Sequence, residues 1–408
     1  MNVKGVTGSL IAAAVALCSL SCHPGARHGG VSYRHVRALW VTRWDFRSPR
    51  DIAAIMERCR QSGFNTVLFQ VRGNGTVTYP SRYEPWAEEF DGRDPGFDPL
   101  ATACAEAHRR GLALHAWVNV IPGWRGKTAP TDPRQLYNAH PDWFWHDEYG
   151  RRQPFGWYNS LNPCLPEVRQ YLVAVMHEIV RRYPVDGLHL DYIRFPNEWH
   201  AMYESLGRVP DYPRDRRTLA MFTRQTGAAH PELDPARWDA WRAAQVTQLV
   251  AQIRGMMRDT RPGAQLSAAV GAFPDEAMRK HYQDSARWVR ERLVDAVYPM
   301  NYSSNMPTFE RCLDTWRGIA RGVAVVPGVM FDKRDADLVS AQVSRAVDAH
   351  GGFAAFAYNS LFERTDETGR PKLDDQSADR AALRRSVLPR IRQLASGDRR
   401  GTTLVRMP

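Results

Sequence analysis

The sequence lacks the short motifs that indicate a bound metal or a nucleotide cofactor. No two cysteines form a CxxC pair, and no predicted strand carries HxH or HExxH, so local spacing gives no metal site. The first predicted strand ends in Thr42, Arg43, Trp44 and Asp45, without the GxGxxG turn that binds phosphates in open α/β folds. We therefore predict a protein that requires no cofactor.

Long apolar runs are also scarce. Beyond the N-terminus no run reaches the roughly 18 residues of a membrane span. Lys4 precedes the small, apolar stretch 8–21, which predicts a secretory signal peptide over residues 1–22. Cys22 directly follows Ser21 and resembles the lipid-bearing cysteine of a bacterial lipobox, although Ser19 stands where an aliphatic residue is usual. We expect an exported protein of the cell envelope, in the periplasm or at the outer membrane, held to the membrane only by a lipid on Cys22; ordinary cleavage is the alternative.

No long block of one charge occurs. Lys and Arg number 55 against 44 Asp and Glu, a formal net charge of +11 that comes mostly from scattered arginine. Because no nucleic-acid-binding motif accompanies this excess, we expect no nucleic-acid partner. Cysteine is rare as well. Cys59 and Cys104 fall in helical patterns and are expected as small buried apolar residues, and together with Cys164 and Cys312 they also permit disulfides.

Eight short apolar, β-rich segments alternate with helical patterns from residue 36 onward. Strands are predicted at 36–42, 65–71, 111–120, 186–193, 265–271, 294–302, 323–329 and 353–359. Helices are predicted at 49–62, 98–110, 166–183, 239–260, 284–292, 309–321, 336–350 and 377–395. Several strand starts lie about 29 residues apart, which fits one strand, one helix and two short loops. The pattern predicts an α/β fold, a (β/α)₈ TIM barrel over residues 33–395 with a disordered tail at 396–408; a doubly wound open sheet is the alternative.

Three connections are longer than ordinary loops between a strand and a helix: 72–97, 119–165 and 194–236. All three follow strand ends, so in a TIM barrel they lie on the C-terminal face, where active sites form. They are rich in aromatic residues, which either line a saccharide cleft or pack the loops into an ordered lid: Tyr79, Tyr83, Trp86, Trp124, Trp143, Phe144, Trp145, Trp157, Tyr158 and Trp199.

The fourth predicted strand places a carboxylate at this face. Strand alternation puts His189, Asp191 and Ile193 on one side, with Asp191 at the C-terminal end. A carboxylate among apolar neighbours is costly unless it is paired, and Arg194 is the nearest cation in sequence. Asp191 is therefore either a catalytic carboxylate, which attacks an anomeric carbon or stabilises an oxocarbenium ion, or half of a structural Asp–Arg pair.

Polar side chains end several other predicted strands. One such residue would usually anchor a loop, but five strands that end this way favour a ligand rich in hydroxyl groups. The candidate substrate-binding residues are Arg72, His115, Trp117, Asn119, His189, Arg194, Asn301, Tyr302, Tyr358 and Asn359.

A second carboxylate is harder to identify, although glycosidases normally use two. The third, sixth, seventh and eighth predicted strands have no acid at their C-terminal ends. Asp275, after the fifth strand, is the favoured general acid, and the alternatives are Asp45, Asp332, Glu84 and Glu363. A metal-dependent deacetylase or amidase is a further reading, in which His115, His189 and Asp191 cluster.

Several motifs resemble the glycosyl hydrolase-like 10 family. They are RALWVT from Arg37, GFNTV from Gly63, QVR from Gln70, DPL from Asp98, HAWVN from His115, GLHLDYIRFP from Gly187, PMNY from Pro299 and FAYNSL from Phe356. The resemblance covers about residues 33–365. Met300 departs from the pattern, because the family commonly has Gln before the Asn-Tyr pair.

The resemblance implies an exported or lipid-anchored TIM-barrel glycosidase of bacterial cell-surface glycans, including peptidoglycan strands stripped of peptide. It assigns the family aspartate to Asp191 and its polar positions to Arg72, His115, Asn119, Arg194, Asn301 and Tyr358. We accordingly predict a glycoside hydrolase with Asp191 and Asp275 as its carboxylates and a polysaccharide as its partner. The rival interpretation is a non-catalytic glycan-binding protein on the same barrel.

Overall fold

The computed structural model describes residues 35–196, 210–320, 322–332, 335–366, 368 and 370–401. The described residues all fall within one compact unit. The predicted signal peptide with Cys22, and Trp199 of the aromatic loops, lie outside the described residues. Within the part of the chain that is described, no helix is both long and apolar enough to cross a membrane.

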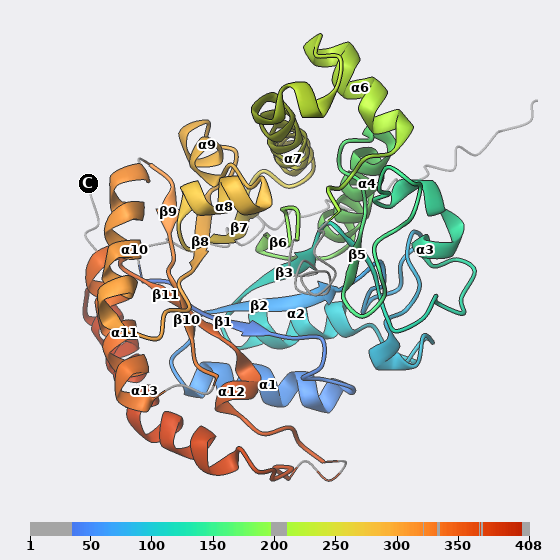
Figure 1. Cartoon of the computed structure of the whole chain (residues 1–408). Coiled ribbons are helices and arrows are strands. Elements are labelled where there is room, and N and C mark those ends of the chain that lie inside the picture. Colours follow the sequence, from blue (N-terminus) through green and yellow to red (C-terminus); the bar gives the residue numbers. More distant parts are fainter. Residues whose placement is uncertain are drawn as a thin grey trace, which may run out of the picture. The chain divides into compact units, whose positions relative to one another are not determined.

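The described chain forms a closed parallel barrel (Figure 1). Pairing runs from β11 through β1, β2, β3, β6, β7 and β8, and β10 closes the ring by pairing with both β8 and β11. The strands are β1 Arg37–Val41, β2 Thr66–Arg72, β3 Ala113–Asn119, β6 Gly187–Asp191, β7 Gln265–Gly271, β8 Ala296–Met300, β9 Ala324–Val325, β10 Gly328–Met330 and β11 Phe353–Phe356. The predicted TIM barrel is confirmed.

The seventh position of the barrel is split into β9 and β10 by Val326 and Pro327. Proline has no amide hydrogen for the sheet, so the strand cannot continue unbroken through it. The chain stays in the ring because the Val326 amide donates to Val297 and the Pro327 carbonyl accepts from Ala354.

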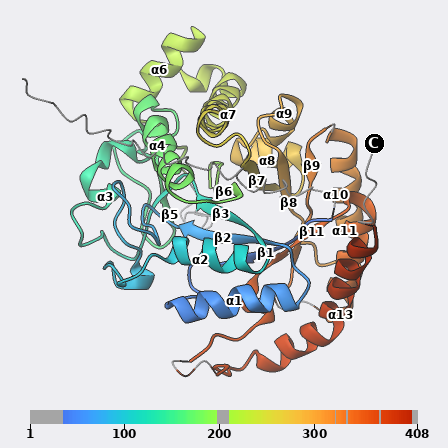
Figure 2. The same cartoon turned by 180° about the vertical axis from the view of Figure 1, so that it is seen from behind.

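Helices surround the barrel, and many begin with a proline in the first turn (Figures 1 and 2). Side chains cap several of them: Ser48 caps α1, Asp98 caps α2, Asp234 caps α7 and Asn305 caps α10, each accepting from a backbone amide of the first turn. The predicted helices correspond to α1 Pro49–Gln61, α2 Pro99–Arg109, α4 Pro166–Arg182, α7 Pro235–Thr260, α9 Ser285–Arg290, α10 Met306–Ile319, α11 Ala336–His350 and α13 Ser377–Gly401.

Several shorter elements within the connections were not predicted from the sequence. The long connection after β3 contains a hairpin of β4 Pro122–Arg125 and β5 Tyr158–Ser160. The remaining elements are α3 Leu136–Ala139, α6 Arg216–Thr226, α8 Pro274–His281, α12 Tyr358–Leu361 and the single-turn helices η1 Glu88–Phe90, η2 Pro141–Trp143 and η4 Pro231–Leu233.

The C-terminal boundary of the barrel domain is corrected. Helix α13 continues past Ala395 to Gly401, where the sequence predicted a disordered tail from residue 396. Its apolar contacts with the core include Ile391, which is buried, and Leu394, which is partly buried. Residues 402–408 lie outside the described part.

The barrel interior is filled by side chains that alternate along the strands. On β1, Ala38 and Trp40 point inward, whereas Leu39 and Val41 pack against the surrounding helices. The Trp40 indole donates to His189 Nε2 at 3.1 Å, and His189 Nδ1 contacts Ser267 Oγ at 2.9 Å. This layer fills the barrel below its mouth. The four described cysteines are buried and unpaired, as expected for Cys59 and Cys104: Cys59, Cys104, Cys164 and Cys312.

Candidate active site

A cavity of about 320 Å³ lies at the C-terminal mouth of the barrel; we call it the mouth cavity. Strand ends and the β4–β5 hairpin supply its walls. It is lined by Trp40, Thr42, Trp44, Gln70, Trp117, Asn119, Arg125, Trp157, Tyr158, Asp191, Tyr192, Arg194, Ala269, Met300, Tyr302 and Phe356. Among the described residues that line it, Asp191 is the only carboxylate.

Asp191 is the last residue of β6 and is buried. Its Oδ1 accepts from the Tyr192 amide at 2.6 Å and from Arg194 Nη1 at 3.3 Å. Burial raises the pKa of Asp191, while Arg194, the Tyr192 amide and the Trp117 indole act in the opposite direction. The carboxyl group can therefore serve as an anion held by Arg194 or, at lower pH, as an acid.

A tight turn after β6 fixes this arrangement. Tyr192 has φ of 47°, which is unusual for a tyrosine and lets the chain reverse directly behind Asp191. The Arg194 guanidinium then stacks over the Tyr192 ring at 4.3 Å, and Tyr158 meets that ring edge-on at 4.9 Å. The cation next to Asp191 is thus held by both charge and ring contacts.

Some buried polar atoms of the mouth cavity have no hydrogen-bond partner among the described residues. They are Asn119 Oδ1 and Trp157 Nε1. Buried polar groups are normally satisfied, so one donor and one acceptor here are available to a ligand or to water. Asn119 pairs in register with Asp191 across β3 and β6, which places its free acceptor next to the carboxylate strand end.

Aromatic and cationic side chains form the sides of the mouth cavity. Arg125 lies over Trp157 at 5.0 Å and over Tyr158 at 5.3 Å, and Arg43 lies over Trp44 at 4.2 Å. Rings of this kind can stack on the apolar C–H face of a sugar, while the polar groups described above bind hydroxyls. Of the aromatic residues predicted from the long loops, Trp157 and Tyr158 line this cavity, and Phe144 and Trp145 are buried in the core.

The predicted substrate-binding residues divide into two groups. Trp117, Asn119, Arg194 and Tyr302 line the mouth cavity with Asp191. The others do not line it: Arg72, His115, His189, Asn301, Tyr358 and Asn359.

Arg72 does not face the mouth cavity, because it is committed to a buried ion pair. Its guanidinium binds both carboxylate oxygens of Glu84, with a shortest contact of 2.7 Å, and both side chains are 0% exposed. Arg72 Nη1 also donates to the carbonyls of Asn119, Val120 and Pro122. The pair therefore joins the loop after β2 to the chain after β3.

The remaining residues of this second group either hydrogen-bond to neighbouring segments of the protein or are buried in the barrel below the mouth cavity. Asn301 donates to the Phe309 carbonyl at 2.9 Å, the Tyr358 hydroxyl accepts from Arg58 at 2.8 Å, and the Asn359 carbonyl accepts from Arg380 at 2.7 Å. His115 and His189 are buried below the mouth, and burial lowers the pKa of His115 to about 4. Within the described ranges no three His, Cys, Asp or Glu side chains are grouped to hold a metal, so the predicted cluster with Asp191 does not form.

The candidates for a second carboxylate are placed away from the mouth cavity. Asp275 is exposed in the first turn of α8, so the predicted partnership with Asp191 is not supported by the geometry. Asp332 is exposed, Glu84 is paired with Arg72, and Glu363 is paired with Arg384 at 2.9 Å. Acidic residues near strand ends could be found in the sequence, but the sequence did not indicate which of their side chains line the mouth cavity.

Asp45 follows the end of β1 in the chain. Its Oδ2 accepts from the Thr42 amide at 2.7 Å and from the Thr42 hydroxyl at 2.9 Å. Asp45 is buried and does not line the mouth cavity. Burial raises the pKa of Asp45 to about 6.

This raised pKa predicts a pH-dependent stability. Because the folded state holds the Asp45 proton up to a pKa of about 6 and the unfolded state only to about 3.9, the contribution to stability is greatest in acid and falls as pH rises through this window, by about 1–3 kcal/mol. Asp45→Asn cannot ionise. Urea unfolding of both proteins at pH 4.5 and pH 7 should show the wild type losing more stability than the variant. A difference between the two proteins that does not change with pH would contradict the assignment.

Trp44, Arg125 and Tyr192 are among the residues of the mouth cavity that were not predicted from the sequence. Trp44 and Tyr192 directly follow residues that were identified, and a turn places them at the mouth. Arg125 reaches it only because the β4–β5 hairpin forms, and the sequence gave no distinct alternation for two such short strands.

The family profile described as Glycosyl hydrolase-like 10 matches residues 35–321. Glycosyl hydrolase DigH of Escherichia coli K12 is 28% identical over 274 residues, 60% of this chain and 56% of that protein. Glycosyl hydrolase YngK of Bacillus subtilis is 27% identical over 323 residues, 70% of this chain and 58% of that protein. An S-layer-related protein of Niallia circulans is 23% identical over 285 residues, 61% of this chain and 17% of that protein. The chain thus spans little more than half the length of the first two relatives.

Solved structures share the barrel. The glycoside hydrolase domain of PgaB (BpsB) from Bordetella bronchiseptica has a TM-score of 0.57 at 14% identity, covering 86% of this chain and 98% of that domain. The catalytic domain of β-amylase from Paenibacillus polymyxa has a TM-score of 0.59 at 10% identity, covering 88% of this chain and 99% of that domain. At these identities the likeness concerns the fold.

Proposed function

Because this chain belongs to the glycosyl hydrolase-like 10 family, we propose that it is a glycosidase of a bacterial cell-surface polysaccharide, the glycan strands of peptidoglycan. The observation that carries the proposal is Asp191, a buried carboxylate beside Arg194 at the mouth of the barrel. The names of the relatives support hydrolysis of glycosyl bonds, and the name of the S-layer-related protein supports a substrate at the cell surface.

Asp191 acts on the anomeric carbon of the sugar bound in the mouth cavity. In its ionised form, held by Arg194, the carboxylate either forms a bond to that carbon as the glycosidic C–O bond breaks or stabilises the positive charge that develops there. In both cases one water completes the hydrolysis: its oxygen ends on the anomeric carbon, in place of any bond to Asp191, and the leaving oxygen gains a proton. Asn119 and Trp157 orient the sugar through their free polar atoms, and Trp117 and Tyr302 enclose it. These residues position the bond to be cleaved within reach of the carboxylate.

Digestion of purified peptidoglycan tests this proposal. Glycan strands with and without stem peptides are incubated with the full chain, and the products are identified by mass spectrometry. We expect shorter saccharides from the strands without peptide. Intact strands in both incubations, from a protein shown to be folded, would refute hydrolysis of this polymer.

A second candidate function is glycan binding without cleavage. It is favoured by one observation: within the described ranges, the mouth cavity contains the single carboxylate Asp191. Pelleting of the protein with glycan strands that it leaves uncut would support this function.

We further propose that the protein acts outside the cytoplasm and is attached to a membrane by a lipid on Cys22. It binds no nucleic acid in this role. We expect wild-type protein to take up radiolabelled palmitate and to fractionate with membranes. Cys22→Ser should lose the label and be recovered in the soluble fraction, because the thiol that carries the lipid is missing. An unlabelled wild-type protein would show ordinary cleavage instead.

A further inference from the structure

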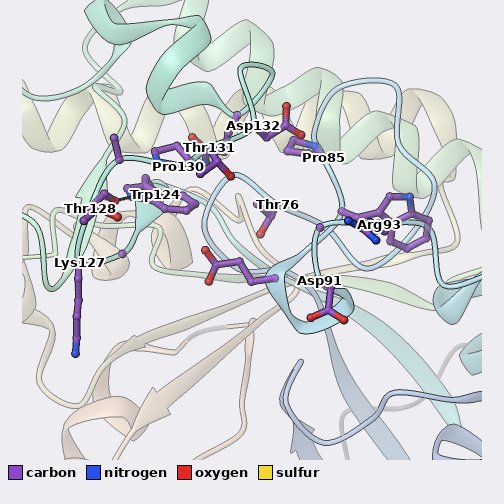
Figure 3. Close-up of a pocket in the computed structure, with 16 residues that line it drawn as sticks. Thr76, Pro85, Asp91, Arg93, Trp124, Lys127, Thr128, Pro130, Thr131 and Asp132 are labelled. Carbon is purple, nitrogen blue, oxygen red and sulfur yellow. Dashed lines mark hydrogen bonds between the residues drawn. The ribbon is translucent and has the colours of Figure 1, made fainter.

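A second and larger cavity, of about 600 Å³, lies beside the barrel mouth; we call it the loop cavity (Figure 3). One wall comes from the loop after β2, with Thr76, Trp86 and Glu88, and the other from β4 and the following loop, with Trp124 and Thr131. Figure 3 shows Thr76 between Trp124 on one side and Asp91 and Arg93 on the other. This volume is in the range of pockets that hold small organic ligands.

The walls of the loop cavity are held together in advance. Gln135 Nε2 donates to the carbonyls of Asn74 at 3.2 Å and Gly123 at 2.6 Å, so one side chain joins the two loops. At Gly75, with φ of 71°, an added Cβ would lie 2.3 Å from the Gly123 carbonyl oxygen, so the backbones meet directly. The Trp124 indole donates to the Thr128 carbonyl at 2.9 Å, which fixes its ring. A ligand would meet a preformed surface.

The lining fits an uncharged polar ligand with an apolar face. Trp124 is buried and Trp86 is half-buried, so the two tryptophans give apolar ring surface within the cavity. The side chains of Glu88, Asp91 and Arg93 make no hydrogen bond or ion pair with the described residues and can bind hydroxyl or amide groups. Two free acids, Glu88 and Asp91, are balanced by Arg93 and Lys127, which disfavours a strongly charged ligand.

The loop cavity shares a wall with the mouth cavity. Trp124 and Arg125 are successive residues of β4; the first lines the loop cavity and the second lines the mouth cavity. Successive strand residues point to opposite faces, so β4 separates the two spaces. An ion pair between Arg43 and Glu89, at 2.8 Å, also connects the two cavities. Glu89 is the sequence neighbour of Glu88, which lines the loop cavity, and Arg43 is the sequence neighbour of Trp44, which lines the mouth cavity.

We propose that the loop cavity binds a further uncharged sugar unit of the glycan chain whose reacting bond lies at Asp191. The chain crosses the ridge formed by Arg125 and the Arg43–Glu89 pair, so the protein acts on long glycans in preference to short ones. The site itself rests on the lining and position of the loop cavity, and the identity of the polymer rests on the proposed function.

The test is the dependence of binding on chain length. Peptide-free glycan is fractionated into a disaccharide and an octasaccharide, and the affinity for each is measured by calorimetry with the full chain carrying Asp191→Asn, so that nothing is cleaved. Adding Trp86→Ala should lower the ratio of octasaccharide to disaccharide affinity about tenfold, because one stacking surface is lost. Glu88→Gln is a milder change at an exposed position. It should lower the same ratio in the same direction, and it replaces Trp86→Ala in the test if that variant does not fold.

Trp143→Ala is the matched control. Trp143 is also half-buried, stacks on His140 and lines neither cavity. It should leave the ratio as it is. A ratio that is unchanged in both loop-cavity variants would overturn the proposal. So would an effect of Glu88→Gln confined to strands that carry stem peptides, because the occupant would then be a peptide.

Failure of this proposal is distinguishable from failure of the proposed function. A wild-type protein that cleaves no glycan, together with a fall in the affinity ratio, leaves the second sugar site intact and refutes hydrolysis. If the wild-type protein cleaves glycan and the affinity ratio is unchanged in the variants, hydrolysis is supported and the second sugar site is refuted.

Discussion

Asp191→Asn should lower kcat for glycan hydrolysis by about 10³-fold or more, because an amide can neither attack an anomeric carbon nor carry the compensating charge. Asn retains nearly the shape of Asp, so sugar binding should persist through Trp117, Asn119 and Tyr302. The rate is measured as the release of reducing ends from peptide-free strands. Pelleting with the same strands reports binding separately.

Asp45→Asn is the matched control for this experiment. Asp45 is also a buried aspartate just beyond the C-terminal end of a barrel strand, but its carboxylate accepts from Thr42 and does not line the mouth cavity. It should retain a rate within a few-fold of the wild type. Equal losses in the two variants, with both folded, would show that the position of Asp191 is not special and would move the reacting carboxylate elsewhere.

Glu84→Gln should be the most destabilising single change of a charged residue. It leaves the Arg72 guanidinium charged, buried and without its counter-ion, and removing one partner of a buried pair costs about 3–5 kcal/mol. The free energy of unfolding is measured by urea titration at pH 7. The midpoint should fall sharply while the chain still binds glycan below the transition, because neither residue lines the mouth cavity.

Glu276→Gln provides the comparison. Glu276 pairs with Lys280 at 2.5 Å on the exposed face of α8, and exposed pairs contribute about 0–1 kcal/mol. The two variants make the same chemical change at a buried and an exposed pair. If both cost the same, the Arg72–Glu84 pair would not hold the loops as the structure indicates.

The barrel could be predicted from the sequence because each β/α unit is a local pattern. A continuous apolar strand, a helix and the spacing between strand starts each depend on nearby residues only, and all eight strands were placed within a few residues of their observed positions. The break at Pro327 and the extension of α13 to Gly401 are local deviations that leave the topology as predicted. The β4–β5 hairpin was missed because its short strands are paired across a long insertion.

The mouth of the barrel could be predicted only in part. Strand alternation correctly turned Trp117 and Asn119 inward, yet it did the same for His115, four residues earlier on β3, which lies too deep to reach the cavity. Alternation gives direction but not depth. Alternation also could not predict the side-chain direction of Arg72, which pairs with Glu84, or of Asn301, which follows the end of β8.

The Arg72 side chain has a consequence for how this fold can change. In TIM barrels the loops on the C-terminal face usually vary one at a time, which lets new activities arise on a constant frame. Here one guanidinium binds Glu84 from the loop after β2 and three backbone carbonyls, of Asn119, Val120 and Pro122, from the chain after β3. Replacing either loop alone would leave the buried Arg72 guanidinium without some of its partners. We therefore expect the two loops to change together in evolution, and a transfer of one loop to another barrel has to include the other loop.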